Sequence, residues 1–227
     1  YEISCSLVGS EMCIRDRVYN FANDPNSNTT TLGISHLPFT VKGANSLAGL
    51  SEINVSHLEL ENLSFPYCVS INSLFINEES TGNTYNTADI TVTLAHELGH
   101  YLGLHHVFSE TENENSCEDT DYCADTPTYN KKAYDMDCAY IEVNDPDNFT
   151  FANLVNRENC LTGESFVSYN IMDYAISYSD RFTPEQRARI RHVLLYSPLI
   201  PGPKAGQEAG TRSAPSGLMK LPIRTAK

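Results

Sequence analysis

The stretch that decides the fold is His96-Glu97-Leu98-Gly99-His100-Tyr101-Leu102-Gly103-Leu104-His105-His106. Residues four apart on a helix share one face, so His96 and His100 can offer both imidazoles to one metal ion. Gly103 can end the helix in a left-handed conformation, which allows His106 to turn back as a third ligand. Three protein ligands leave the fourth position of a zinc ion open, as in catalytic sites. The motif therefore predicts a catalytic Zn²⁺ centre.

Glu97 is the predicted general base of this centre. Beside the first histidine, its carboxylate can reach a zinc-bound water and take its proton, which is the arrangement used in metal-assisted peptide hydrolysis. Two further residues are alternative third ligands. His105 directly precedes His106, and Glu118 lies downstream in a loop rich in cysteine and turn-forming residues.

A sheet is predicted before the motif, because apolar runs there are bounded by turn-forming residues. The run Cys68–Ile76 alternates polar and apolar residues as far as Leu74, which predicts a half-exposed strand. Asn86 or Thr87 is predicted to cap the motif helix, with Asp89 in its first turn. The other apolar segments are Val18–Phe21, Leu32–Phe39 and Ile53–Leu60.

The chain after the motif is predicted to be mostly irregular. Residues 131–165 show no clean hydrophobic period, which argues against regular helices or strands there. A final helix is predicted from Thr183-Pro184-Glu185-Gln186, with threonine at the N-cap, proline at the first position and glutamine at the third. This helix is expected to end before Pro198.

The composition excludes several classes of function. The chain has 227 residues, a hydrophobic content of 41% and a net charge of −14, which fit a globular protein. Nucleic acid is a disfavoured partner, because binding phosphates requires clustered Lys and Arg. No apolar run approaches the roughly 20 residues of a transmembrane span. Seven cysteines favour an oxidising compartment, so we expect a secreted, periplasmic or cell-surface protein.

Three segments are expected along the chain. Residues 6–17 match the translated read-through of a sequencing adapter, so residues 1–17 are predicted not to belong to the protein. Residues 18–201 are predicted to form one catalytic domain, since their number suits a single large domain. Residues 202–227 contain Gly, Pro and Ser, and their charged residues are all basic except for Glu208. This composition predicts a flexible tail.

These motifs resemble one family. The pattern H-E-x-x-H-x-x-G-x-x-H with a later methionine turn marks the metzincin zinc metalloproteases. Other details are similar to the pappalysin-like (cytophagalysin/ulilysin-type) branch of secreted endopeptidases. They are His96–Val107, Cys123–Pro127, Asn170–Tyr174 and Phe182–Gln186, and the resemblance spans about residues 18–198. The spacing that marks the family selects His106 over His105 as the third ligand.

The resemblance implies an α+β fold of the metzincin type. A mixed twisted sheet and the active-site helix would form an N-terminal subdomain, and an irregular C-terminal subdomain would carry the methionine turn and the final helix. Met172 is expected beneath the zinc, and Tyr174 is expected to hydrogen-bond the oxyanion. The strand around Val69–Ile76 would be the edge strand that pairs with an extended substrate. An ordinary core methionine, a packing tyrosine and a strand without a ligand are the alternatives.

The acidic loop after the motif is a candidate calcium site. Asp119, Asp121 and Asp125 lie close together in the sequence, and oxygen-rich loops suit Ca²⁺. The resemblance also implies structural calcium in this region, although the spacing is not that of an EF-hand. A solvated acidic loop is the alternative.

Two disulfides are expected in the same irregular region. Cys117–Cys123 and Cys138–Cys160 would pin it, which would leave Cys68 unpaired. Connectivity cannot be read from sequence, so other pairings stay open.

The expected function is that of a secreted zinc-dependent endopeptidase acting on proteins or peptides, with Glu97 as the base. A zinc-bearing adhesion or binding module with weak catalysis is one rival, but it would be expected to lack Glu97. A gluzincin-type peptidase is another, with Glu118 as third ligand, but that glutamate lies in a loop rather than on a helix. The acidic body of the chain favours substrates with basic residues near the scissile bond.

Overall fold

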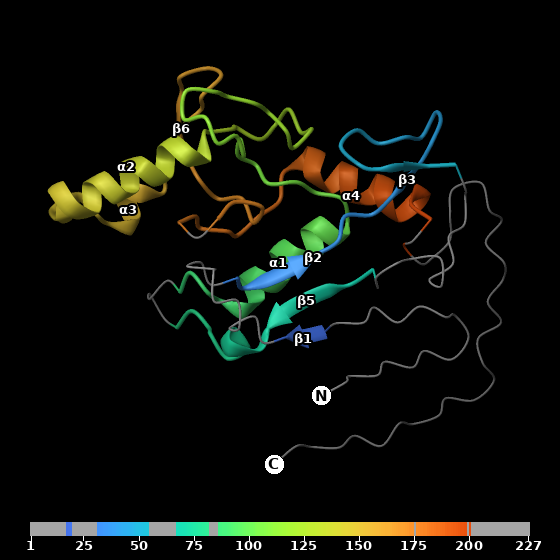
Figure 1. The fold of residues 1–227 in the computed structure, drawn as a ribbon, viewed down its shortest axis with the longest axis horizontal. Coiled ribbons are helices and arrows are strands. Elements are labelled where there is room, and N and C mark those ends of the chain that lie inside the picture. Colours follow the sequence, from blue (N-terminus) through green and yellow to red (C-terminus); the bar gives the residue numbers. More distant parts are fainter. Residues whose placement is uncertain are drawn as a thin grey trace, which may run out of the picture.

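The computed structural model describes residues 17–19, 31–54, 67–81, 86–174, 176–198 and 200. Its elements are β1 (Arg17–Tyr19), β2 (Gly33–Ser35), β3 (Thr40–Val41), β4 (Glu52–Ile53), β5 (Val69–Asn72), η2 (Ser73–Phe75), α1 (Ile90–Tyr101), α2 (Lys131–Asn144), η3 (Pro146–Asn148), α3 (Phe151–Leu154), β6 (Asn156–Glu158), β7 (Ser165–Val167) and α4 (Pro184–Tyr196). These helices and small sheets make an α+β fold, as expected (Figure 1). The predictions for residues 1–16, 55–60 and 202–227 lie outside the described residues.

The largest sheet has the strand order β1-β5-β2, with β1 parallel and β2 antiparallel to β5. All four residues of β5 are buried. The prediction of a half-exposed strand over Cys68–Ile76 is therefore wrong, because the strand is buried and ends at Asn72, before η2 begins at Ser73. The edge strand expected around Val69–Ile76 instead lies in the middle of the three described strands. The alternating pattern misled because polar Ser70 and Asn72 are buried here, and Asn72 donates a hydrogen bond to the carbonyl of Thr31.

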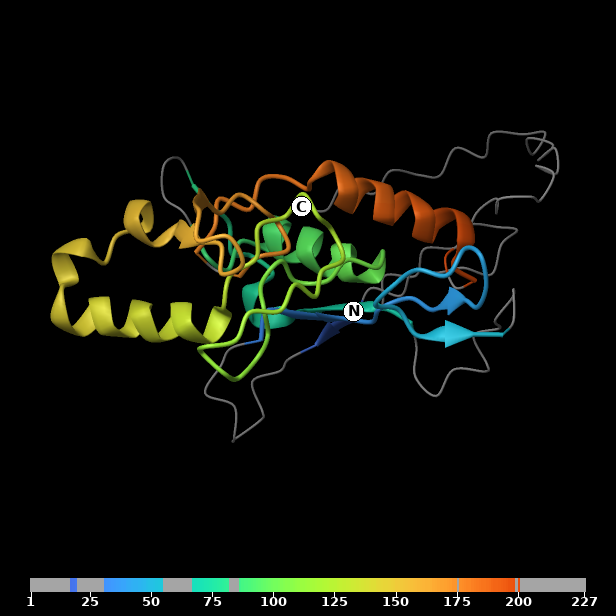
Figure 2. The same ribbon diagram turned by 90° about the horizontal axis from the view of Figure 1, so that it is seen from above.

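Helix α1 carries the motif between the sheet and α4 (Figures 1 and 2). Its N-cap is Asp89, whose carboxylate accepts hydrogen bonds from the backbone N–H of Thr91 and Val92, so the predicted cap at Asn86 or Thr87 is wrong. Asn86 instead makes its own turn, accepting from the N–H of Ala88. A charged acceptor at the positive end of the dipole stabilises the start of the helix.

Helix α4 closes the core over the C-terminal end of α1. It starts with the predicted capping box, in which Thr183 and Gln186 satisfy each other's backbone N–H groups. The buried Arg189 donates hydrogen bonds to the carbonyl of Gly103 (2.6 Å) and to that of Ala48 (2.6 Å). The core that joins α4 to α1 and the sheet consists of Leu50, Tyr67, Val69, Ile71, Tyr101, Val193 and Ile200.

The prediction that residues 131–165 are irregular is wrong. This segment forms α2, η3, α3 and β6. Helices α2 and α3 lie together at one end of the molecule (Figures 1 and 2). No residue of α2 is fully buried, and Tyr140 and Val143 are exposed. Its half-buried residues Tyr134, Cys138 and Ile141 follow helical spacing, but exposed apolar residues such as Met136 and Val143 on the other faces obscure the 3.6-residue period.

The predicted disulfide pairs are also wrong. The structure pairs Cys117 with Cys160, and among the described residues Cys68, Cys123 and Cys138 are free. The pairing depends on the backbone around Cys160, whose N–H donates to the carbonyl of Thr128 and so lies beside the acidic loop. Neighbours of that kind, far apart in the chain, are invisible in the sequence.

Within the part of the chain that the structure describes, no helix is both long and apolar enough to cross a bilayer.

Candidate metal centre

Three imidazoles meet beside α1. His96 and His100 lie one turn apart on the helix, and Gly103, with a φ of 89°, reverses the chain so that His106 faces both. One nitrogen from each ring lies within 4.8 Å of the others, and Nε2 of His100 is 3.1 Å from Nε2 of His106. Over the described ranges, no other group of three such side chains is spaced to hold a metal.

These nitrogens fit a zinc ion. Zinc holds nitrogen ligands at about 2.0–2.1 Å in a tetrahedron, which places neighbouring ligand atoms about 3.4 Å apart. Nδ1 of His96 hydrogen-bonds the carbonyl oxygen of Ile171 (2.7 Å), and Nδ1 of His100 hydrogen-bonds that of Leu104 (2.9 Å). Carbonyl acceptors place the proton on Nδ1 and leave the lone pair of Nε2 free for a metal.

The environment keeps two of these rings neutral. Burial, together with the charge of the neighbouring histidines, lowers the pKa of His96 to about 4 and that of His100 to about 3. Neutral imidazole is the form that binds a metal. The alternative third ligand, His105, faces the ring of Tyr122 instead, with 5.4 Å between the ring centroids, and is not part of the three-histidine group.

Glu97 lies under the edge strand β2. Its side chain is 7% exposed, and burial raises its pKa to about 7. A Cβ at Gly33 would stand 2.7 Å from Cγ and 2.9 Å from Oε1 of Glu97. Only glycine lets the strand pass this close, so Gly33 belongs to the site, although nothing in the sequence beyond the residue type indicates it.

Tyr174 lies beside the histidines and is partly exposed. Its ring centroid is 4.7 Å from that of His106 and 6.0 Å from that of His96. Burial, together with the negative charge of Glu110, raises the pKa of Tyr174, so the phenol keeps its proton and can donate a hydrogen bond. The ammonium of Lys131 stands 5.2 Å from the ring centroid.

Met172 lies below the histidines and is fully buried. It packs with Leu104 and Val107, and its backbone N–H donates to the side chain of Asn170 (2.9 Å). A Cβ at Gly99 of α1 would stand 2.3 Å from Sδ of Met172. The helix and the methionine turn are therefore in direct contact through a glycine inside the motif.

A buried polar network holds the methionine turn from behind. The carboxylate of Asp173 accepts hydrogen bonds from the hydroxyls of Tyr129 (2.5 Å) and Ser168. Nη2 of Arg157 lies 3.7 Å from Oδ2 of the same carboxylate. The side chains of Arg157 and Asp173 are almost completely buried. Sequence analysis missed this ion pair, since nothing in the local pattern links the two positions.

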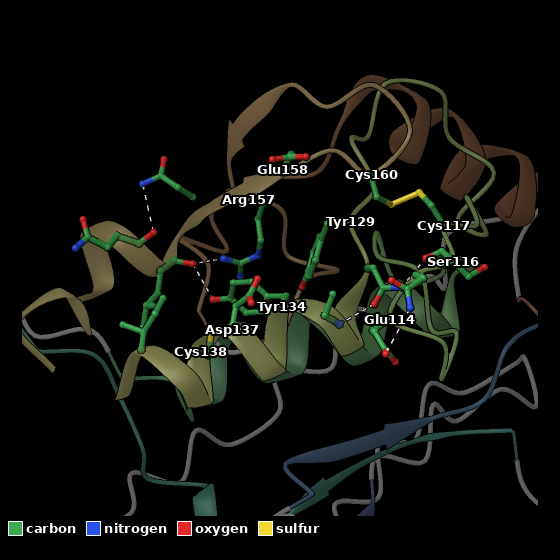
Figure 3. A pocket seen from close by; sticks show the side chains of 17 residues that line it. Glu114, Ser116, Cys117, Tyr129, Tyr134, Asp137, Cys138, Arg157, Glu158 and Cys160 are labelled. Atoms are coloured by element: carbon green, nitrogen blue, oxygen red, sulfur yellow. Dashed lines mark hydrogen bonds between the residues drawn. A yellow bond between two sulfur atoms is a disulfide. The ribbon is translucent and has the colours of Figure 1, made fainter. Parts of the chain in front are cut away.

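Arg157 and Tyr129 also form a wall of a cavity of about 450 Å³ between α2, β6 and the segment before the Cys117–Cys160 disulfide (Figure 3). None of the three histidines, Glu97 or Tyr174 lines this cavity, so it is distinct from the metal centre.

The acidic loop does not gather its carboxylates around one point. Asp121 is buried and accepts hydrogen bonds from the N–H of Cys123 (2.9 Å) and the hydroxyl of Thr126 (2.6 Å). Asp125 accepts from the first turn of α4, and Asp119 accepts from the N–H of Asp121 (3.4 Å). The three carboxylates thus act as acceptors for the loop and the helix, and calcium at this loop stays a prediction.

Comparison with known proteins points to a protease family. The family model Peptidase_M43, described as Pregnancy-associated plasma protein-A, matches residues 68–195. An extracellular metalloprotease of Arthroderma benhamiae is 36% identical over 99 residues, which cover 43% of this chain and 29% of that protein. The extracellular metalloprotease of Trichophyton verrucosum gives the same values, and that of Arthroderma otae is 35% identical over 99 residues. No solved structure matches.

The matched segment contains the three histidines, Glu97, Met172 and Tyr174. The chain spans less than a third of the length of the curated relatives it matches.

Proposed function

Because this chain belongs to the Peptidase_M43 family, we propose that it is a secreted, zinc-dependent endopeptidase with Glu97 as its general base. The observation that carries the proposal is the convergence of three histidine nitrogens within 4.8 Å, beside a buried carboxylate. The relatives are named extracellular metalloproteases, which supports both the activity and the location outside the cell.

His96, His100 and His106 would hold the zinc. The ion, when bound, supplies Lewis-acid activation of water and of the scissile carbonyl. Glu97 takes the proton from the attacking water and passes it to the leaving amine. Its burial keeps bulk water away from that proton, and a cation held by the histidines would favour the carboxylate form that accepts it.

Tyr174 would stabilise the negative charge that develops on the carbonyl oxygen. Its ring stands beside that of His106 and its phenol keeps its proton, so it can donate to an oxyanion. Met172 would support the three ligands from below through its contact with Gly99. The proposed function also implies the two subdomains of a metzincin. The sheet and α1 would form the N-terminal subdomain, and the methionine turn and α4 would belong to the C-terminal one.

An extended peptide substrate would pair with β2. In the three-stranded sheet, β5 lies in the middle and β2 at the edge next to Glu97. An edge strand offers unpaired backbone groups that a peptide can match with its own. The substrate would thereby lie with its scissile bond over the general base.

Substituting Glu97→Gln tests the proposal. We expect the variant to retain one equivalent of zinc, measured by elemental analysis, and to lose cleavage of a peptide library, because an amide cannot accept the proton. The wild-type protein should lose cleavage on chelation and regain it on adding Zn²⁺. Full activity of the Gln variant would refute the role of Glu97, and zinc retention with no cleavage by the wild type would favour a binding module.

A second pair of variants tests the rival ligand. Glu118 is outside the three-histidine group, and its backbone N–H is held by the hydroxyl of Ser109. His106→Ala should therefore lose zinc, whereas Glu118→Ala should keep it. The opposite result would favour a gluzincin-type peptidase.

A further inference from the structure

The third histidine is held differently from the other two. His96 and His100 lie on α1, and their Nδ1 atoms bond backbone carbonyls that the fold fixes. His106 lies beyond the helix, and its Nδ1 bonds a side chain, the carboxylate of Glu110. Ring contacts alone do not choose which of the two ring nitrogens faces the metal, because a half turn about χ2 keeps the same plane.

The backbone around Glu110 is anchored. The residue before it, Ser109, is fully buried, its N–H donates to the carbonyl of Tyr129 (2.8 Å), and its carbonyl accepts from the N–H of Lys131 (3.3 Å). The carboxylate is therefore presented to the imidazole from a segment pinned to the start of α2. The anchored backbone of this segment therefore brings the side chains of Glu110 and His106 together.

Stacking fixes the plane of the His106 ring, but it does not distinguish the two ring orientations that are related by a half turn about χ2. The ring of Phe108 lies parallel to it, with 4.8 Å between centroids and 11° between planes, and the ring of Tyr174 contacts it edge-on at 4.7 Å. A half turn of the imidazole within this plane would present a carbon where Nε2 now lies. The bond from Nδ1 to Glu110 distinguishes the two orientations on one side of the ring, and the approach of Nε2 to His100 distinguishes them on the metal side.

We propose that Glu110 is a positioning residue for the zinc ligand His106: its carboxylate accepts the Nδ1–H bond, fixes the tautomer and turns Nε2 toward the metal. The inference rests on the proposed function. A carboxylate acceptor also increases the electron density of the imidazole, so it strengthens the metal bond beyond what a neutral carbonyl would give. Glu110 does not touch the substrate in this role.

Zinc affinity tests the proposal without any measurement of proteolysis. In purified protein, Glu110→Ala should weaken zinc binding by about 10- to 100-fold in competition with a chromophoric chelator, as loss of such a partner typically does. Glu110→Gln, which keeps an acceptor oxygen without the charge, should fall between Ala and wild type. The matched control is Glu112→Gln, because that side chain is 92% exposed and only approaches Lys132.

A merely structural role is separated by two further readouts. The urea unfolding midpoint of the metal-free protein should be the same for Glu110→Ala and the control, since the contact is at the surface end of the site. The visible absorption bands of the Co²⁺-substituted protein should change in Glu110→Ala and not in Glu112→Gln, because they report the ligand geometry.

The outcomes distinguish this inference from the proposed function. Wild-type zinc binding with unchanged affinity in Glu110→Ala would overturn the role of Glu110 alone. A wild-type chain that binds no zinc would overturn both. Weakened affinity accompanied by an equal loss in Glu112→Gln would also overturn it, since a general loss of negative charge would then be the cause.

Discussion

Substituting Gly99→Ala should destabilise the protein, although helix propensity alone predicts the opposite. In a helix interior, alanine is favoured over glycine by about 0.8–1.0 kcal/mol. Here a Cβ would stand 2.3 Å from Sδ of Met172, against the roughly 3.5–4.0 Å of an ordinary contact. Met172 is fully buried, so its side chain must repack against its neighbours to make room. Overpacking of this kind costs about 1–3 kcal/mol, and after the gain in helix propensity we expect a net loss of up to about 2 kcal/mol.

Thermal and urea unfolding of the metal-free protein measure this loss. A loss of up to about 2 kcal/mol corresponds to a fall in Tm of up to about 8 °C for a domain of this size. A double-mutant cycle with Met172→Ala isolates the contact: Met172→Ala alone should cost about 2–5 kcal/mol by leaving a cavity, and Gly99→Ala should be harmless or stabilising in its presence. If Gly99→Ala stabilises the wild type, or if the two effects add, the contact between helix and methionine turn is not what requires the glycine.

Three further predictions concern the site and its support. Gly33→Ala should push the Glu97 carboxylate aside and lower kcat/KM by about 10- to 100-fold while zinc content stays unchanged; activity equal to wild type would contradict the close approach of β2. Asp173→Asn should cost about 3–5 kcal/mol in urea unfolding, because it leaves a buried guanidinium without its charge partner, and an unchanged midpoint would argue against the ion pair. In the metal-free protein, His96 and His100 should favour unfolding as the pH falls from about 6.5 toward 4, because their folded-state pKa values are lowered and the unfolded chain binds protons first. The raised pKa of Glu97 acts in the opposite direction below about pH 7, so Glu97→Gln should show a larger fall in unfolding midpoint between pH 7 and pH 5 than the wild type. Equal falls in the two proteins would contradict this.

Local geometry made part of the fold predictable from sequence. The positions of His96 and His100 on one helix face follow from the four-residue spacing, and the start of α4 follows from a capping box whose members are three residues apart. These features depend on a few consecutive residues, so composition and spacing determine them.

Where the environment decides, sequence reasoning failed. The strand over Val69–Asn72 was expected at an edge, yet it is buried in the middle of the sheet because its polar residues find partners inside. Helix α2 was not predicted because exposed apolar side chains, among them Met136 and Val143, obscure the period of its half-buried face. The disulfide joins Cys117 to Cys160 across 43 residues, a pairing that no local pattern indicates.

The sequence by itself determined which residues can bind a metal and where the chain must turn: histidines at helical spacing, a glycine that adopts a φ of 89°, and a third histidine after it. The tertiary structure alone decided how these residues are oriented. The carbonyl of Ile171 lies 75 residues from the ring of His96, and Gly33 lies 64 residues before Glu97. Ligand type and spacing are local properties of the chain, whereas hydrogen-bond acceptors, burial and close packing come from segments that only folding brings together.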